Sequence, residues 1–401
     1  MNNSLQALSI ELHSLTIFKS LKSDPVVKNL MQCLDVLDSA KSLWEKVDIY
    51  SNLVSDIYSN ADGNLTNYIK NIVLDDENIY ITTVGQNKRI SKSMQECLNR
   101  ELNILQKLAT LKAQDIIDLL KWDEALPTWD SEVIDLIKEY TDRVNNISKY
   151  GYGMYAKYHM FYINNKNVIV PVKYPDQISL QDLVDYKEQQ KIIIDNTKAL
   201  LLGKPASNIL LTGDAGTGKS STIKAVCNEL YKEGLRILEV RKDQLREIPA
   251  ILDELTINPL KFIIFIDDLS FQTNDDNFSA LKAILEGSVS ARSNNVVIYA
   301  TSNRRHIVRE KFSDRDDEVH ANDTMQEAIS LSERFGIQIT FSKPDKATYL
   351  NIVKHLAEQN NINIDEEKLF KDAEKMALSR GGRSARLAKQ LIDLYLSDET
   401  V

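Results

Sequence analysis

The stretch from residue 208 to residue 221 constrains the fold more than any other part of the chain. It reads N-I-L-L-T-G-D-A-G-T-G-K-S-S and fits the pattern G-x-x-x-x-G-K-[ST] at every fixed position. An apolar run precedes the glycines and a helix-forming segment follows them, so we expect a buried strand, a tight loop and a helix in succession. This order of elements is typical of a parallel α/β sheet.

Three of the thirteen glycines, Gly213, Gly216 and Gly218, let this loop turn tightly because they lack a Cβ atom. Backbone N–H groups can then converge on a phosphate at the N-terminus of the next helix, where the helix dipole also favours an anion. Lys219 would direct its charge to the β- and γ-phosphates, and the Ser220 hydroxyl can ligate Mg²⁺. The alternative, a glycine-rich turn without a ligand, is disfavoured by the Lys-Ser ending. The predicted phosphate-binding residues are Gly213, Asp214, Ala215, Gly216, Thr217, Gly218, Lys219, Ser220 and Ser221.

A second pattern is the apolar run 262–266, which ends in Asp267 and Asp268. At the carboxyl end of a strand beside the phosphate loop, Asp267 would hold Mg²⁺ directly or through water, and Asp268 could orient an attacking water. Taken alone, the pattern is as typical of a strand that ends in a polar turn. The phosphate loop favours a nucleotide site formed by both segments.

Composition narrows the class of protein. The 401 residues are 43% hydrophobic and 27% charged, as in an ordinary globular protein of about two or three domains. No apolar run approaches the ~18 residues that cross a bilayer, and no signal peptide is apparent, so we expect a cytoplasmic protein without a membrane partner. Cys33, Cys97 and Cys227 are far apart, and the five histidines lack metal-binding spacing, so neither a disulfide framework nor a zinc site is expected. The net charge of −9 argues against broad non-specific binding to nucleic acid.

The periodicity of the chain changes twice. Residues 1–149 have apolar residues at helical spacing, with breaks near residues 24–25, 61–63, 84–86 and 126–127, and predict a helical N-terminal domain whose apolar stripes form its core. Residues 150–179 are rich in tyrosine and predict a hairpin of strands 158–163 and 168–172. Packing between domains is favoured there over stacking on bases.

From residue 180 onward strands and helices alternate. We predict strands at 209–212, 235–240, 262–266, 296–301 and 337–341, and therefore a five-stranded parallel sheet with helices on both faces. This α/β domain spans 180–343. Residues 344–401 are predicted to be helical, with an interruption at Gly381 and Gly382.

Together these motifs resemble an AAA+ ATPase module over about 180–396. The resemblance rests on the phosphate loop (Walker A), the acidic strand (Walker B), a strand that ends at 300–303, the segment 332–336 and the terminal helices. More narrowly, segments 212–221, 267–271, 285–292 and 300–306 are similar to a bacterial AAA+ family of uncharacterised function. The resemblance implies a P-loop NTPase with a five-stranded parallel sheet and a C-terminal helical lid, preceded by a mostly helical N-terminal domain.

The resemblance also implies roles for single residues. Asn303 would be sensor 1, which positions the lytic water, and Arg334 would be an arginine finger that acts on a neighbouring subunit of a homo-oligomer. Arg386 would be sensor 2, with Arg383 as the alternative, and Val184 would contact adenine. Each role has a simpler alternative: Asn303 could cap a helix, and Arg334 could form a surface ion pair with Glu333 or Glu327.

The implied function is hydrolysis of ATP with Mg²⁺, coupled to remodelling or assembly of a protein or nucleic-acid complex. Asp268 stands where many AAA+ proteins carry glutamate, so hydrolysis could be slow or await a partner, and a nucleotide-controlled binding switch is the alternative. Segment 241–245 lacks the aromatic-hydrophobic-Gly loop of threading motors, and a small-molecule kinase has no use for the terminal helices. Arg304, Arg305, Arg309 and Lys311 favour a DNA-directed role, whereas Asp314, Asp316 and Asp317 weaken it.

Overall fold

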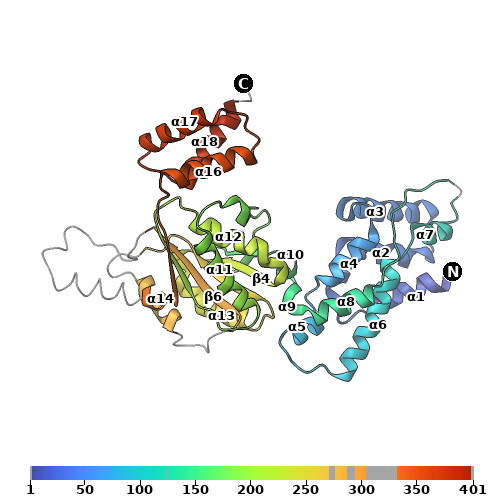
Figure 1. The fold of residues 1–401 in the computed structure, drawn as a ribbon. Helices are drawn as coiled ribbons and strands as arrows, with labels where there is room; N and C mark the ends of the chain where they lie inside the picture. The colour runs from blue at the N-terminus through green and yellow to red at the C-terminus, as the bar shows by residue number, and fades with distance from the viewer. Residues whose placement is uncertain (1, 123, 271–275, 287–293, 304–331, 399–401) are drawn as a thin grey trace. The chain divides into compact units, whose positions relative to one another are not determined.

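The computed structural model describes residues 2–122, 124–270, 276–286, 294–303 and 332–398. The chain divides into two compact units, Met1–Lys157 and Tyr158–Val401 (Figure 1).

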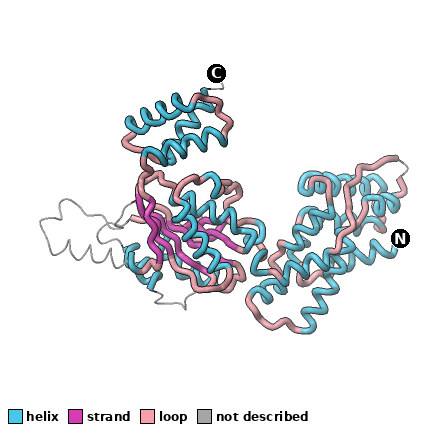
Figure 2. Tube along the Cα trace, viewed as in Figure 1, coloured by secondary structure: helices cyan, strands magenta, loops and turns pink. Residues whose placement is uncertain are grey.

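The described residues of the N-terminal unit form helices joined by loops, as the apolar spacing of residues 1–149 predicts (Figure 2). The α-helices are α1 (Asn2–His13), α2 (Pro25–Leu37), α3 (Leu43–Ala61), α4 (Leu65–Leu74), α5 (Ile79–Gly85), α6 (Lys92–Ala109), α7 (Ala113–Leu120), α8 (Leu136–Asn145), α9 (Ile147–Tyr150) and α10 (Met154–Lys157).

Local chemistry sets the predicted breaks. The Asp24 side chain accepts hydrogen bonds from the backbone N–H groups of Val26 and Val27, and Pro25 begins α2 with a fixed φ. Helix α3 ends at Ala61 because Asp62 adopts a left-handed conformation with φ 47°. The breaks expected near residues 24–25 and 61–63 are therefore confirmed.

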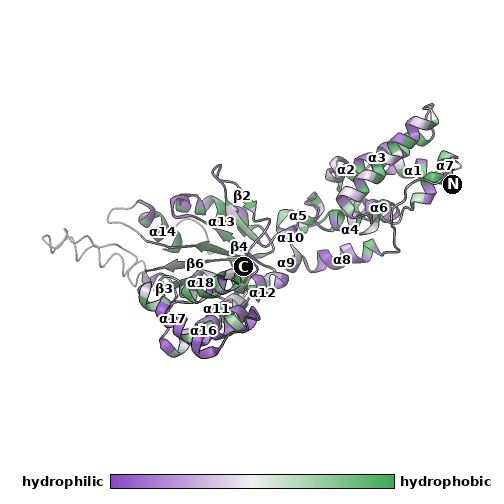
Figure 3. Cartoon of the chain, turned by 90° about the horizontal axis from the view of Figure 1, so that it is seen from above, coloured by the Kyte–Doolittle hydropathy of each residue, from purple (hydrophilic) through white to green (hydrophobic). Residues whose placement is uncertain are grey.

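The N-terminal core holds one fully buried carboxylate. Apolar side chains of these helices face inward, and polar and apolar residues alternate around them in Figure 3. Within this core, Glu101 of α6 is 0% exposed and accepts hydrogen bonds from the backbone N–H groups of Thr16 (2.7 Å), Ile17 (3.0 Å) and Phe18 (3.0 Å). The carboxylate thus satisfies three donors of the segment that follows α1.

The C-terminal unit is built on one seven-stranded sheet (magenta in Figure 2). Its strands run in the order β2-β1-β4-β5-β6-β3-β7. They are β1 (Met160–Ile163), β2 (Ile169–Pro171), β3 (Ile209–Gly213), β4 (Leu235–Glu239), β5 (Lys261–Ile266), β6 (Val296–Ser302) and β7 (Ile337–Phe341). All neighbouring pairs are parallel except β1 and β2.

The expectation of a five-stranded sheet is wrong in its number of strands. The five predicted strands are present as β3 to β7, and the predicted hairpin is present as β1 and β2. However, β1 pairs in parallel with β4, with Met160 opposite Ile237, so the hairpin adds two strands to the same sheet.

Helices cover both faces of this sheet, as the apolar and almost fully buried strands β3 and β5 require. Alternate sheet residues share a buried cluster with side chains of α11 (Lys187–Leu201) and α12 (Lys219–Leu230). The intervening residues of β5, Phe262, Ile264 and Ile266, are also 0% exposed, and α13 (Ile248–Thr256) contacts β6. Helix α14 (Asp276–Glu286) lies between β5 and β6 in the chain.

The chain ends in three helices with a core of their own, and the predicted interruption at Gly381 and Gly382 separates the last two. They are α16 (Lys346–Gln359), α17 (Glu366–Ser379) and α18 (Ala385–Asp398). The side chains of these helices form a buried cluster that contains no residue of the sheet. Its fully buried members are Tyr349, Val353, Ala373 and Ala388. This three-helix group therefore packs as a small separate layer of the C-terminal unit.

Candidate nucleotide-binding site

The glycine loop leaves β3 and enters α12 with a backbone that only glycine suits. Gly213 has φ 129°, and a Cβ at this position would lie 2.0 Å from the carbonyl oxygen of Phe341 on β7. Gly218, with φ 89°, stands at the N-cap of α12. The loop therefore presents backbone at the N-terminus of a helix, which is the arrangement that binds phosphate.

Lys219 holds its ammonium group inside this loop. Lys219 is only 5% exposed. Its Nζ donates to the carbonyl oxygens of Gly213 (3.0 Å) and Asp214 (2.7 Å) and to Oδ1 of Asn303 (3.1 Å). Burial lowers the pKa of Lys219, while the negative charges of Asp214 and Asp267 act to raise it. A poorly hydrated cation thus lies where the loop would receive a phosphate.

Ser220 and Asp267 meet across the first turn of α12 and the end of β5. Ser220 Oγ donates to Asp267 Oδ1 at 2.6 Å. The same carboxylate oxygen accepts from Thr301 Oγ1 at 2.5 Å and from the backbone N–H of Asp268 at 3.1 Å. Because the serine proton goes to the carboxylate, the serine lone pairs are left for a hard cation, and this hydroxyl and carboxylate fit Mg²⁺.

Asn303 links the loop lysine to the second acid. Its Nδ2 donates to Asp268 Oδ1 at 2.7 Å, while its Oδ1 accepts from Lys219. Asp268 adopts a left-handed conformation with φ 52°, which is uncommon for a residue with a Cβ. Asn303, which directly follows the carboxyl end of β6, thereby connects the glycine loop to the acidic turn after β5. The helix that Asn303 could alternatively cap would begin in 304–331, outside the described residues.

The first turn of α18 touches the glycine loop. The backbone N–H of Arg386 donates to the carbonyl oxygen of Gly216 at 3.3 Å, and a Cβ at position 216 would lie 3.2 Å from the Cβ of Arg386. The positive charge of Arg386 contributes to the lowered pKa of Lys219. Of the two alternatives for this role, Arg386 is thus the one beside the loop.

Arg383 is engaged within the three-helix group instead. Its Nε and Nη2 each donate to the carboxylate of Glu374 at 2.8 Å. This bidentate hydrogen bonding lowers the pKa of Glu374.

Val184 lies on the side of the three-helix group. It is half-buried and packs against that group's core, and the neighbouring Leu183 comes close to Gly218. The segment is fixed by Gln190 of α11, whose Nε2 donates to the carbonyl oxygens of Leu183 (2.9 Å) and Asp185 (2.8 Å). Segment 183–185 therefore lies between the loop and the terminal helices.

Arg334 is half-buried in the segment that leads into β7, the strand paired with β3. Its expected role, that of an arginine finger, would be performed at the nucleotide site of a second copy of the chain, so it stays a prediction. Several other residues named from the sequence lie outside the described residues, as do parts of the segments 267–271, 285–292 and 300–306. They are Arg304, Arg305, Arg309, Lys311, Asp314, Asp316, Asp317 and Glu327.

Sequence reasoning assigned no role to Thr301, whose hydroxyl donates to the Asp267 carboxylate and accepts from the backbone N–H of Asp268. A signal existed, because residues two apart in a strand face the same side, and Thr301 lies two residues before Asn303. It also assigned no role to Gln190, which is 4% exposed. Gln190 lies six residues after Val184 on a helix that carries no recognised motif, and a lone glutamine in a helix gives no comparable signal.

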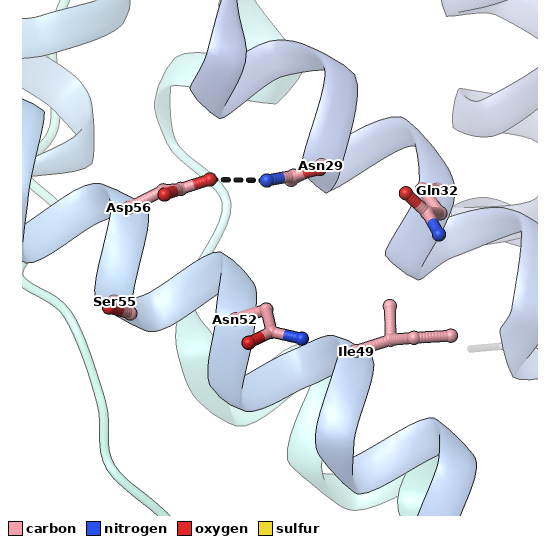
Figure 4. A pocket seen from close by; sticks show the side chains of 6 residues that line it. All are labelled: Asn29, Gln32, Ile49, Asn52, Ser55 and Asp56. Atoms are coloured by element: carbon pink, nitrogen blue, oxygen red, sulfur yellow. Dashed lines mark hydrogen bonds between the residues drawn. The ribbon is translucent and has the colours of Figure 1, made fainter.

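A separate polar cavity of about 320 Å³ lies in the N-terminal unit, between α2 and α3 (Figure 4). A hydrogen bond from Asn29 Nδ2 to Asp56 Oδ2 crosses it. Its lining residues are Asn29, Gln32, Ile49, Asn52, Ser55 and Asp56. The cavity has a single carboxylate and no basic group, so it is not built to receive a phosphate.

The described part of the chain contains no cluster of three or more histidine, cysteine, aspartate or glutamate residues that could hold a metal ion. Within the same residues, every helix is too short or too polar to span a bilayer.

Comparisons with known proteins give a family but no function. Among curated proteins, none matches the sequence. One similar solved structure is the Holliday junction branch migration motor RuvB of Thermotoga maritima, at 15% sequence identity and a TM-score of 0.33 over 54% of this chain and 72% of that chain. This likeness is too slight to support an argument. A family model described as "Protein of unknown function (DUF815)" matches residues 155–399, which is more than half of the 401 residues, and the chain therefore belongs to this family.

Proposed function

We propose that this protein is an AAA+ ATPase, which binds ATP with Mg²⁺ in the loop 213–221 and hydrolyses it to ADP and phosphate. One observation carries the proposal: Asn303 is hydrogen-bonded to both Lys219 and Asp268, directly beside the pair formed by Ser220 and Asp267. Groups from the loop and from the ends of β5 and β6 thus converge at the carboxyl edge of a parallel sheet, where such sheets bind ligands.

Nucleotide binding would use the loop backbone and Lys219. Entry of a phosphate would let the Lys219 ammonium exchange its bonds to the Gly213 and Asp214 carbonyl oxygens for bonds to phosphate oxygens. Ser220 and Asp267 would hold Mg²⁺, which supplies charge neutralisation between the β- and γ-phosphates. Val184, in the segment fixed by Gln190, would contact the base.

Hydrolysis would depend on Asp268 and Asn303. The Asp268 carboxylate accepts the proton of the attacking water, and Asn303, already bonded to that carboxylate, orients the pair. Arg386 would stabilise charge on the phosphates from the terminal helices, which act as a lid, because its backbone already touches Gly216. Arg334 would complete the site of a neighbouring copy.

This arrangement ties turnover to a homo-oligomer, so we propose that the cytoplasmic protein couples hydrolysis to remodelling or assembly of a target complex. The target would be a protein recognised by the N-terminal unit. A nucleic-acid target is less consistent with the net charge of −9.

A nucleotide-controlled switch with slow hydrolysis is the second candidate. It is favoured by Asp268, which is one methylene shorter than glutamate and is already held by Asn303 at 2.7 Å. Asp268→Glu distinguishes the two. A large rise in turnover indicates that the short acid keeps the wild-type protein a switch, whereas a fall indicates that the aspartate geometry serves catalysis.

The test of the proposal is phosphate release by the full chain, measured against protein concentration, with its mass followed by light scattering in the presence and absence of ATP and Mg²⁺. Specific activity should rise with assembly, and Arg334→Ala should lose it while still binding ATP. Lys219→Met should lose binding. Lys224→Met is the matched control, because Lys224 lies on the same helix but pairs with Glu239 at 3.7 Å. Absence of ATP binding by the wild-type protein would refute the proposal.

A further inference from the structure

Thr301 lies between the two acidic residues of the site and is almost completely buried. It is 2% exposed and stands near the end of β6, opposite Leu211 of the loop-bearing strand β3. Strand β6 also adjoins β5, which carries Asp267 at its end. Thr301 therefore lies beside the turn that follows β5, and its side chain can reach Asp267 and Asp268.

The Thr301 hydroxyl makes two hydrogen bonds whose directions are fixed by chemistry. A hydroxyl has one proton, and the partners are a carboxylate oxygen and a backbone N–H. Thr301 Oγ1 therefore donates to Asp267 Oδ1 at 2.5 Å and accepts from the N–H of Asp268 at 3.0 Å. The Thr301 carbonyl oxygen also accepts from the N–H of Leu269 at 2.7 Å. One residue thus binds three successive residues of the turn.

These bonds have a consequence for each acid. Asp267 accepts all its hydrogen bonds from the described residues through Oδ1, so Oδ2 is left available. Asp268 is kept at φ 52°, a conformation unfavourable for a residue with a Cβ, and its side chain reaches Asn303 from there. Without the Thr301 hydroxyl, the Asp267 carboxylate loses one of its three hydrogen bonds and the Asp268 N–H loses one of its two acceptors, so both are held less firmly.

We infer that Thr301 is a positioning residue for Mg²⁺-dependent hydrolysis: it fixes the orientation of the Asp267 carboxylate and the backbone of Asp268. This inference rests on the proposed function. It predicts that the hydroxyl of Thr301 matters for the metal requirement and the chemical step, while ATP binding at saturating Mg²⁺ does not depend on it.

Thr301→Val tests this, because valine keeps the shape and loses only the hydroxyl. We expect the Mg²⁺ concentration for half-maximal turnover to rise about 10- to 100-fold and kcat to fall, as for other residues that orient metal ligands, with KM for ATP at saturating Mg²⁺ unchanged. Thr301→Ser should restore both values. Thr197→Val is the matched control, since Thr197 is also buried and hydrogen-bonded, but to Tyr299 and the backbone of α11.

A second readout needs no nucleotide. Hydrogen exchange at the Asp268 amide, resolved to single residues by mass spectrometry, should be slow in the wild-type protein and in Thr301→Ser. It should be faster in Thr301→Val, which leaves this amide only its 3.1 Å hydrogen bond to Asp267 Oδ1. If Thr301→Val does not fold, Thr301→Cys takes its place, because a thiol is a weak hydrogen-bonding group of similar size.

The outcomes separate the two proposals. A wild-type protein that neither binds nor hydrolyses ATP overturns the proposed function and this inference with it. An active wild-type protein whose Thr301→Val variant has the same Mg²⁺ dependence overturns the inference alone, as does unchanged exchange at the Asp268 amide. A raised Mg²⁺ requirement that Thr301→Ser rescues supports it.

Discussion

Replacing Asp268 by asparagine isolates the chemical role of one carboxylate. The residue has φ 52°, and asparagine tolerates this left-handed region better than other residues with a Cβ. The asparagine oxygen can also accept the 2.7 Å hydrogen bond from Asn303 Nδ2 that the carboxylate accepts now. The substitution therefore preserves the turn and its contact with Asn303, and removes the negative charge and the ability to take a proton.

The expected loss follows from that role. A positioned general base contributes about 10²- to 10⁴-fold to a rate, so Asp268→Asn should lower kcat by this factor, or raise the barrier by about 3 to 5 kcal/mol. Affinity for ATP should be unchanged or higher, because Asp267 and Ser220 keep their 2.6 Å contact and a negative charge near the phosphates is gone.

Single-turnover release of phosphate measures the first effect, and titration with a fluorescent ATP analogue measures the second. Asp243→Asn is the control, because Asp243 is an exposed aspartate of the same unit that pairs with Arg241. Turnover by Asp268→Asn equal to that of the wild-type protein would refute the reasoning and remove Asp268 from the mechanism.

Three further predictions address other parts of the molecule. Glu101→Gln should lower the free energy of unfolding of the N-terminal unit by about 2 to 4 kcal/mol, because an amide NH₂ group would face backbone donors that now meet a carboxylate. The fluorescence of the three tryptophans, all in this unit, measures this loss during urea unfolding, and an unchanged unfolding midpoint would contradict the prediction. Because burial lowers the pKa of Lys219 from 10.5, the ligand-free protein loses the positive charge of this ammonium group at a lower pH than an ordinary lysine would. The Kd for ATP should therefore increase as pH rises through that lowered pKa. A Kd that stays constant up to pH 10.5 would contradict the prediction. Arg386→Ala should weaken ATP binding by about 10-fold or more, because Arg386 lies beside the glycine loop. Arg383→Ala should leave ATP binding intact and lower the thermal stability of the terminal helices, because Arg383 binds Glu374. Titration calorimetry measures the binding and scanning calorimetry the stability, and the reverse pattern would exchange the two roles.

The local elements of the fold could be predicted because local patterns carry them. Strands β3, β5 and β6 are short runs buried on both faces, whereas the edge strand β7 alternates buried and exposed residues, and both patterns can be read locally. The start of α2 at Pro25 and the end of α3 at Ala61 follow from the proline and from the capping aspartates beside them. The place of the hairpin could not be predicted in this way, because its pairing with β4 joins segments more than seventy residues apart, and alternation within a strand does not name its neighbour.

The sequence by itself determined the chemistry of the candidate site: the glycines, Lys219, Ser220, Asp267 and Asp268 are recognisable because a phosphate loop and an acidic strand need those residue types in that order. Only the tertiary structure decided which side chains meet. It brought Arg386 rather than Arg383 to the loop, since Glu374 of the neighbouring helix binds Arg383, and it placed the hydroxyl of Thr301 between the two acids. The physical reason is that these contacts depend on the order and register of strands and on helix packing, and so join residues whose separation along the chain says nothing about their distance in space.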